Sequence, residues 1–380
     1  MTNSKNNLPI KNADFLLPKK DIDLTKWAVV ACDQHTSDLS YWQKLETLVG
    51  NSKSTLNLIL PEAYLGNRNE EQHIDGIKKA MGDYLATDMF NSFSGAVAIE
   101  RKVSNGKTRN GLLLAIDLEH YDFNKSSKAL IRASEGTVLE RIPPRVKVRQ
   151  NCMLDMSHVL VLYDDPSFKV QNAVTAAKSE PLYDFDLNMN GGHISGSLIK
   201  DTTNIFNAFN ELMASLGQNS SDKMLFAVGD GNHSLAAAKT VYENKKAIGE
   251  GEFSRYALVE AVNIYDDSLE FEPIHRLVLG SGLEKFKTEL DKNMPANPIE
   301  AVEFVDKLAA KHNLEVDYIH GESHLKSLAE SKKCLAIKLE PMDKKGFFTY
   351  IIKHGALPKK TFSMGEAEDK RYYLETAKIV

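Results

Sequence analysis

The chain has 380 residues, 42% of them hydrophobic, and a formal net charge of −5. This length supports a large core in two domains or one domain with an appendage, while the acidic balance argues against a nucleic acid or anionic membrane partner. Three widely spaced cysteines and a polar N-terminus without an apolar signal core favour a soluble cytoplasmic protein without a disulfide framework or CxxC zinc site.

The N-terminal part of the chain predicts strands that alternate with helices. Apolar runs and helical spacing predict a strand at 27–31, a helix at 37–50, a strand at 56–60, a helix at 74–90 and paired strands at 95–103 and 111–118. Asn105-Gly106 between the last two strands is a strong hairpin signal. This part of the chain therefore predicts helices packed on a sheet.

The pattern changes in the C-terminal part. We expect strands at 159–163 and 255–263, helices at 202–216 and 235–245, and then charged helices at 283–292 and up to 311 followed by short strands. The order of elements predicts an α/β fold, with α+β as the alternative, built on a mixed sheet. The expected domains are a ligand-binding core at 1–285 and a smaller α/β region at 286–380.

One junction between a strand and a helix concentrates polar residues. The apolar run of Phe226-Ala-Val-Gly-Asp-Gly-Asn-His-Ser234 stops just before a helix-forming segment. Such a junction presents unpaired backbone N–H groups and the positive end of a helix dipole, and glycines let a ligand approach closely. The candidate binding residues here are Gly229, Gly231, Asn232 and Ser234, and the candidate catalytic residues are Asp230 and His233. The alternative is a helix cap after a glycine turn, which does not account for the imidazole.

A second candidate is the basic segment 132–149. It contains Arg132, Arg141 and Arg145, followed by Lys147 and Arg149, and Glu135, close to the first arginine, is a candidate catalytic residue. Forked, charge-assisted hydrogen bonds from such arginines can hold a phosphate or a carboxylate. The alternative is a solvated basic surface, but a glycine turn and two prolines favour a shaped loop. Aromatic residues do not interleave with these cations, so nucleic acid is disfavoured.

Polar residues also follow the first predicted strand, in Cys32-Asp33-Gln34-His35. Ligands of α/β proteins gather at the carboxyl ends of strands, so Asp33 and Asp230 are expected to converge as a general base or as Mg²⁺ ligands, beside Gln34. Cys32 is interpreted as a packing residue rather than a nucleophile.

Two further motifs supply candidate binding residues, which are Gly192, His193, His275 and Arg276. Each of these motifs can also be an ordinary turn. The histidines lack the i,i+4 spacing of a helical zinc motif, so no structural zinc is expected.

Five motifs together resemble one bacterial and archaeal family, the domain of unknown function family 1015. They are Trp27–Gln34, Ile131–Arg145, Met189–His193, Val228–Ser234 and Glu272–Arg276. The family's Asp-Gly-His-His-Arg signature is similar to the phosphate-binding motif of the ParB and sulfiredoxin superfamily, which includes nucleotide-dependent free serine kinases. This chain has Asn232 and Ser234 where that signature has a His and the Arg, so another arginine would have to supply the charge for a triphosphate.

The residues and the resemblance together predict a small-molecule phosphotransfer enzyme, with serine or a similar metabolite as substrate and Mg²⁺ with ATP or ADP as cofactors. A phosphoserine-type phosphomonoester hydrolase and a non-catalytic nucleotide or metabolite sensor are the alternatives. A ParB-type partitioning protein is disfavoured by the acidic charge. In each main alternative the partner is a small phosphorylated or carboxylate ligand, and the oligomeric state stays open.

Overall fold

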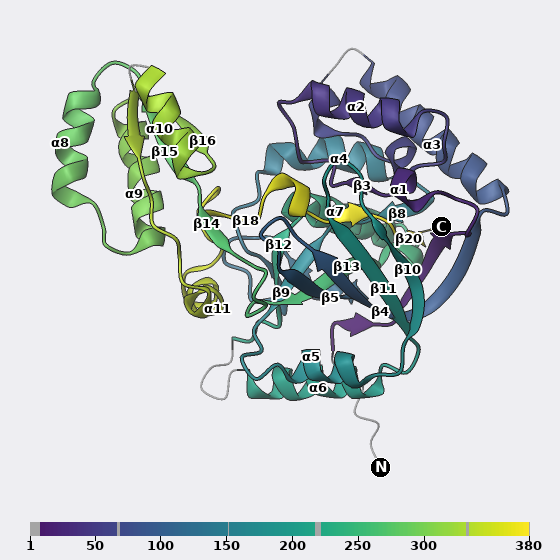
Figure 1. Ribbon diagram of the computed structural model, residues 1–380. Coiled ribbons are helices and arrows are strands. Elements are labelled where there is room, and N and C mark those ends of the chain that lie inside the picture. Colours follow the sequence, from purple (N-terminus) through teal and green to yellow (C-terminus); the bar gives the residue numbers. More distant parts are fainter. Residues whose placement is uncertain (1–7, 67–68, 151, 217–221, 332–333, 380) are drawn as a thin grey trace. The chain divides into compact units, whose positions relative to one another are not determined.

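The computed structural model describes residues 8–66, 69–150, 152–216, 222–331 and 334–379 (Figure 1). Contacts divide the chain into two units. Unit 1 comprises Met1–Ala133, Thr137–Ser268 and Glu366–Val380, and unit 2 comprises Ser134–Gly136 and Leu269–Gly365. The chain therefore leaves unit 1 and returns to it near its C-terminus.

A mixed sheet of thirteen described strands forms the centre of unit 1 and confirms the expected fold class. Its main path runs β6 (Tyr121–Asp122), β7 (Ile131–Ala133), β12 (Phe226–Asp230), β9 (Leu160–Tyr163), β13 (Tyr256–Asn263), β5 (Thr108–Asp117), β4 (Phe90–Lys102), β2 (Ala13–Pro18), β20 (Thr376–Lys378) and β8 (Leu154–Met156). Off this path, β1 (Ile10–Lys11) pairs with β5, and β11 (His193–Ile199) pairs with β4 and with β10 (Glu180–Asp186).

Strand pairings explain the mixed character of the sheet. β12 is parallel to β7 and antiparallel to β9, whereas β13 is parallel to β9 and antiparallel to β5. The predicted hairpin is confirmed as β4 and β5, and Gly106 in its turn has a φ of 79° that suits glycine. A two-stranded pair of β3 (Val29–Val30) with β19 (Tyr372–Tyr373) joins the N-terminal segment to the returning C-terminal segment.

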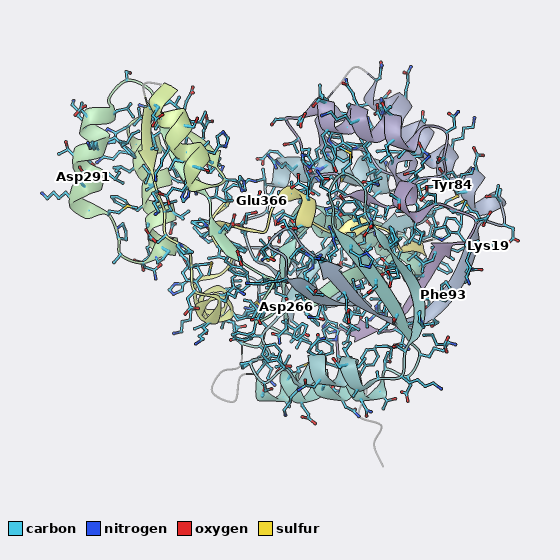
Figure 2. The ribbon with its side chains drawn as sticks, in the orientation of Figure 1. Lys19, Tyr84, Phe93, Asp266, Asp291 and Glu366 are labelled. Carbon is cyan, nitrogen blue, oxygen red and sulfur yellow. The ribbon has the colours of Figure 1, made fainter. Side chains whose placement is uncertain are left out.

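Both faces of the sheet are buried. On β13, Leu258 packs in one hydrophobic cluster, while Ala257 and Val259 pack in another, as the two-residue period of a strand requires. Helices cover the two faces, so the central strands are almost continuously apolar. Phe93 of β4, labelled in Figure 2, stacks on Phe15 of β2 with ring centroids 5.5 Å apart.

The helices of unit 1 are α1 (Leu24–Trp27), α2 (Leu39–Val49), α3 (Glu70–Ala86), α4 (Ile142–Arg149), α5 (Lys169–Ala176), α6 (Thr203–Ser215) and α7 (Asn232–Ala247). Figure 1 shows α2 and α3 on the opposite side of the sheet from α5 and α6. Among the described residues, none of the helices is long and apolar enough to cross a bilayer.

Unit 2 is built on a three-stranded antiparallel sheet. β15 (His275–Leu279) lies between β16 (Glu315–Ile319) and β17 (Cys334–Ile337), and β14 (Phe271–Pro273) pairs with β18 (Phe362–Met364). The helices are α8 (Leu283–Asn293), α9 (Pro298–Lys311), α10 (Glu322–Ser331) and α11 (Lys344–His354). The predicted charged helices are confirmed as α8 and α9, and Asn297 caps α9 through the N–H groups of Ile299 and Glu300.

Candidate functional site

A chain of three polar side chains lies where short β3 ends. His158 is buried, and its Nε2 lies 3.4 Å from Oδ2 of Asp33. Its Nδ1 lies 2.7 Å from the phenol oxygen of Tyr373. Gln34 donates to the second carboxylate oxygen of Asp33 over 3.0 Å. Both nitrogens of the imidazole therefore face a partner, and the Asp33 carboxylate, whose side chain is 24% exposed, is accessible to solvent.

The electrostatics of the Asp33–His158–Tyr373 group favour an ion pair between Asp33 and His158. Desolvation is the largest influence and opposes ionisation of Asp33, but the charge and hydrogen bond of His158, the hydrogen bond from Gln34 and the charge of Lys370 together hold the pKa of that carboxyl well below its usual range. Burial alone would lower the pKa of His158, yet the Asp33 carboxylate raises it. Desolvation and the Asp33 charge raise the pKa of the Cys32 thiol to about 12, so the thiol is protonated and a poor nucleophile at neutral pH.

The glycine junction lies directly beside His158. Gly231 has a φ of 79° at the start of α7, and a Cβ there would come within 3.1 Å of Val159 and 3.4 Å of the His158 ring. Only glycine fits this turn without strain. The charge of Asp230 also contributes to the raised pKa of His158, and Oδ2 of Asp230 lies 3.9 Å from Nζ of Lys370. The structure thus brings the Asp33 segment and the junction into one site.

His233 has a different position from the other junction residues. Its Nε2 accepts the backbone N–H of Val138 over 3.1 Å. This hydrogen bond ties the first turn of α7 to the segment that precedes α4. The catalytic role expected of His233 stays a prediction. Its hydrogen bond with Val138 positions the segment before α4 against α7.

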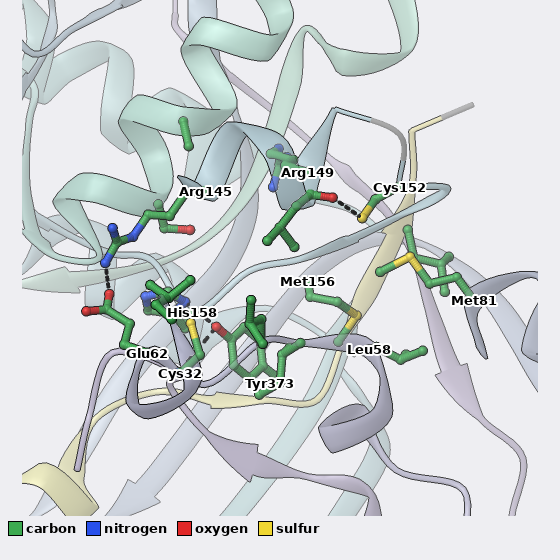
Figure 3. Close-up of a pocket in the computed structure, with 17 residues that line it drawn as sticks. Cys32, Leu58, Glu62, Met81, Arg145, Arg149, Cys152, Met156, His158 and Tyr373 are labelled. Carbon is green, nitrogen blue, oxygen red and sulfur yellow. Dashed lines mark hydrogen bonds and ion pairs between the residues drawn. The ribbon is translucent and has the colours of Figure 1, made fainter. Parts of the chain in front are cut away.

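A cavity of about 100 Å³ opens beside these groups (Figure 3). Cys32, His158 and Tyr373 group at one end, and Met81 and Leu58 lie at the other. Ser234 of α7 also lines the cavity. The remaining walls are largely apolar, with Ile59, Leu60, Leu65, Val148, Leu154, Met156 and Ala237. The site therefore combines a polar end with an apolar chamber.

Two residues of the basic segment line this cavity. Arg145 pairs with Glu62, and Arg149 pairs with the buried carboxylate of Asp155. Both arginines belong to α4, which begins at Ile142. Their charges are balanced by acids, so an anionic ligand would compete with Glu62 for Arg145.

Other arginines of the segment do not line the cavity. Arg132 is buried in β7, where it donates to the carbonyls of Ala129 and Lys223 and pairs with Asp222. Arg141 is exposed, and its carbonyl accepts from Arg145. The expected convergence of Arg132 and Arg141 on the junction is not supported by these contacts, because Arg132 is held within the sheet and Arg141 faces solvent.

Three predicted site residues belong to unit 2. Glu135 accepts the N–H groups of Thr361 over 3.1 Å and Lys360 over 3.2 Å. His275 accepts the N–H of Leu339, and Arg276 forms a forked pair with Asp306. Each side chain thus has a partner in the packing of its own unit.

The glycine loop before β11 has a packing role. A Cβ on Gly191 would collide with Tyr372, and a Cβ on Gly192, whose φ is 77°, would collide with the Lys102 carbonyl. His193 is half-exposed and pairs with Asp184 and Asp186 on the neighbouring strand β10. Neither Gly192 nor His193 lines the cavity.

Three residues of the site have no counterpart in the sequence-based candidates: His158, Lys370 and Tyr373. His158 immediately precedes an expected strand, which was a usable signal. Lys370 and Tyr373 lie in the segment that returns to unit 1, and Tyr373 meets Cys32 across 341 positions of sequence. Local patterns carry no information on such a pairing.

Buried arginines fix the backbone of this returning segment. Arg101 of β4 donates to the carbonyls of Glu368 and Lys370, and Arg109 of β5 donates to the carbonyl of Asp369. Three successive carbonyls are therefore held by two guanidinium groups. The arrangement sets the backbone from which the Lys370 side chain extends toward Asp230.

The chemistry available at the site follows from its donors. Among the described residues, no group of three or more His, Cys, Asp or Glu side chains could hold a metal ion. Mg²⁺ bound with a phosphorylated ligand commonly takes only one or two protein carboxylates. Asp33 and Asp230 supply that number of acids, beside the imidazole of His158 and the ammonium of Lys370.

Fold and site define a mixed α/β protein with a buried carboxylate–imidazole–phenol chain at a strand–helix glycine junction. The chain belongs to the family described as "Protein of unknown function (DUF1015)", whose model matches residues 16–379. The predicted family is thereby confirmed, while its likeness to the ParB and sulfiredoxin motif stays a prediction.

A solved structure of a conserved hypothetical protein from Pyrococcus furiosus is similar at 10% sequence identity and a TM-score of 0.36. The similarity covers 70% of this chain and 95% of that chain. None of the curated proteins compared with the chain matches it.

Proposed function

We propose that this protein is a small-molecule phosphotransfer enzyme that acts on serine or a similar hydroxyl-bearing metabolite. The observation that carries the proposal is the Asp33–His158–Tyr373 chain beside the first turn of α7. Phosphoryl transfer needs chiefly positioning and neutralisation of charge. The site offers an oriented carboxylate, the imidazole of His158, the ammonium of Lys370 and the positive end of a helix dipole.

In this proposal Asp33 orients the substrate hydroxyl and accepts its proton. The ion pair with His158 keeps Asp33 ionised across the neutral range, and the partly exposed carboxylate can reach a ligand. Tyr373 holds His158 through Nδ1, so the imidazole keeps its orientation toward Asp33. The backbone N–H groups at the start of α7 would bind the phosphoryl oxygens.

Lys370 and Asp230 have complementary roles in the same proposal. The ammonium of Lys370, 3.9 Å from Asp230, supplies positive charge for the phosphoryl donor, ATP or ADP. Asp230 is the acid that would hold Mg²⁺, whose chemistry is to neutralise phosphate charge, while Asp33 acts as the base. Ser234 would contact the ligand where it lines the cavity.

The test is turnover by the purified chain. Serine with ATP or ADP and Mg²⁺ should yield phosphoserine, and phosphorus NMR measures its formation. Asp33→Asn should slow this reaction by roughly 100-fold, the scale of losing a general base. Asp38→Asn is the matched control, because Asp38 lies in the same loop but caps α2.

Two results would replace the proposal by an alternative. Release of phosphate from phosphoserine without any transfer from nucleotide would establish a phosphomonoester hydrolase. Saturable nucleotide or metabolite binding with no turnover would establish a sensor. Equal turnover by the Asp33→Asn protein and the unaltered chain would remove Asp33 from the mechanism.

A further inference from the structure

The cavity beside His158 has two chemically distinct parts. Most of its wall is aliphatic or thioether and includes Leu58, Met81 and Met156. Serine has one side-chain carbon and would leave this wall uncovered. An unfilled apolar chamber is a loss of contacts that a better-fitting ligand recovers.

The size of the chamber limits what fits. An apolar cavity of about 150 Å³ accommodates benzene, so a cavity of about 100 Å³ suits a group of about four carbons. Methionine side chains adapt to the shape of such a group, and two of them line the chamber. The fit favours a short or branched aliphatic group over a polar one.

A buried arginine in the same cavity indicates where the polar end of a ligand would bind. Arg149 lines the cavity and uses Nη1 to bind Asp155. Its Nη2 is buried, and no residue in the described ranges provides it with an acceptor, while Oδ2 of its partner Asp155 is likewise buried without a donor. A buried donor without an acceptor is costly, and a carboxylate oxygen is the acceptor that a guanidinium prefers.

We infer that the cavity binds a small carboxylic acid with an aliphatic group of about four carbons. The carboxylate meets Arg149 and the aliphatic group lies among Leu58, Met81 and Met156. The inference rests on the proposed function for one point only, the placement of a reacting hydroxyl beside Asp33. It narrows the substrate from serine to a 3-hydroxy acid with a larger apolar side chain.

The experiment measures binding by calorimetry without nucleotide or Mg²⁺, so it does not depend on turnover. The probes are serine, threonine, 3-hydroxynorvaline and 3-hydroxyleucine, which differ in added carbons. Affinity should rise about fourfold for each buried methylene. The amide of 3-hydroxyleucine should bind at least about tenfold more weakly than the acid, because it lacks the charge that Arg149 recognises.

Variants separate the chamber from the rest of the fold. Met156→Gln should abolish the gain per carbon, Met156→Leu should keep it, and Met213→Gln on α6 is the polar control outside the cavity. Arg149→Lys keeps a charge beside Asp155 but loses the second nitrogen of the planar guanidinium, so it should weaken acid binding and leave amide binding unchanged.

The outcomes distinguish this inference from the proposed function. A rise in affinity with chain length but no phosphoryl transfer supports the inference and removes the proposed function. Equal affinity for serine and 3-hydroxyleucine overturns the inference, even if serine is phosphorylated. An Arg149→Lys protein that binds acid and amide as the unaltered chain does also overturns it.

Discussion

Two carboxylates that the sequence marks as catalytic candidates, Asp33 in unit 1 and Glu135 in unit 2, have opposite environments. Asp33 faces the titratable side chain of His158, and its pKa is lowered. Glu135 accepts backbone N–H groups of Lys360 and Thr361, yet desolvation outweighs these bonds and raises its pKa. A carboxylate among titratable side chains can exchange protons with a ligand. A carboxylate that accepts hydrogen bonds from main-chain N–H groups instead fixes the loop to which those groups belong.

The largest expected difference is in turnover. If the protein transfers phosphoryl groups as proposed, Asp33→Asn should reduce turnover by roughly 100-fold. Glu135→Gln retains an amide oxygen as acceptor and should leave turnover within about threefold, since its contacts lie within unit 2. Steady-state kinetics of both proteins measure the contrast. A Glu135→Gln protein as inactive as Asp33→Asn would place both acids in the mechanism.

The second difference concerns stability. Glu135→Met would leave the N–H groups of Lys360 and Thr361 without their acceptor and should lower the free energy of unfolding by about 1–2 kcal/mol. Glu140→Met is the control, because Glu140 is exposed. Chemical denaturation of both proteins provides the measurement. Equal unfolding midpoints would show that the amide contacts contribute nothing.

The two acids should also give opposite pH dependences of stability. The pKa of Asp33 is lower in the folded state, so its contribution is present above about pH 3.9 and is lost as the pH falls through the folded pKa. The pKa of Glu135 is raised, so the folded state loses stability as the pH rises from about 4.3 through the folded pKa.

Thermal melts between about pH 3 and 6 test these signs. The difference in melting temperature between the unaltered chain and Asp33→Asn should grow with pH. The corresponding difference for Glu135→Gln should shrink with pH. Parallel pH profiles for the two variants would contradict the assigned environments.

The smallest expected effect belongs to Tyr373. Tyr373→Phe removes the phenol oxygen that lies 2.7 Å from His158 and should cost about 1 kcal/mol of stability. It should also loosen the orientation of the imidazole, which NMR of the His158 ring would detect as a change in its titration. Tyr350→Phe is a control in unit 2. An unchanged His158 titration would show that the phenol does not position the ring.

Local sequence patterns predicted several elements that depend on neighbouring residues, but the strand expected at 56–60 is wrong, because Thr55–Leu58 form a 3₁₀ helix capped by Ser54. The β4–β5 hairpin follows from Asn105-Gly106, and the β12–α7 junction follows from an apolar run that ends in glycines. His158, Lys370 and Tyr373 were not predicted. Their places in the site depend on pairings between distant segments, such as β3 with β19. Period and propensity do not encode those pairings.

Glu135 shows how proximity in sequence can mislead. It lies three positions after Arg132, which favoured a shared anion-binding loop. The chain passes from unit 1 to unit 2 between Ala133 and Ser134, so the two side chains belong to different units. A change of unit within a short segment has no composition signal, because Ala133 and Ser134 are ordinary residues for either environment.

The returning segment has a consequence for protein synthesis. The ribosome makes residues 269–365 of unit 2 before it makes Lys370, Arg371 and Tyr373. The earlier residues of unit 1 therefore cannot complete the site until these three have been synthesised. At about 5–20 residues per second, that wait lasts several seconds or more. During this interval Arg101 and Arg109 lack the carbonyls of residues 368–370 that they bind in the finished fold. A chain released before Glu366 would therefore carry the glycine junction and Asp33 but no assembled site.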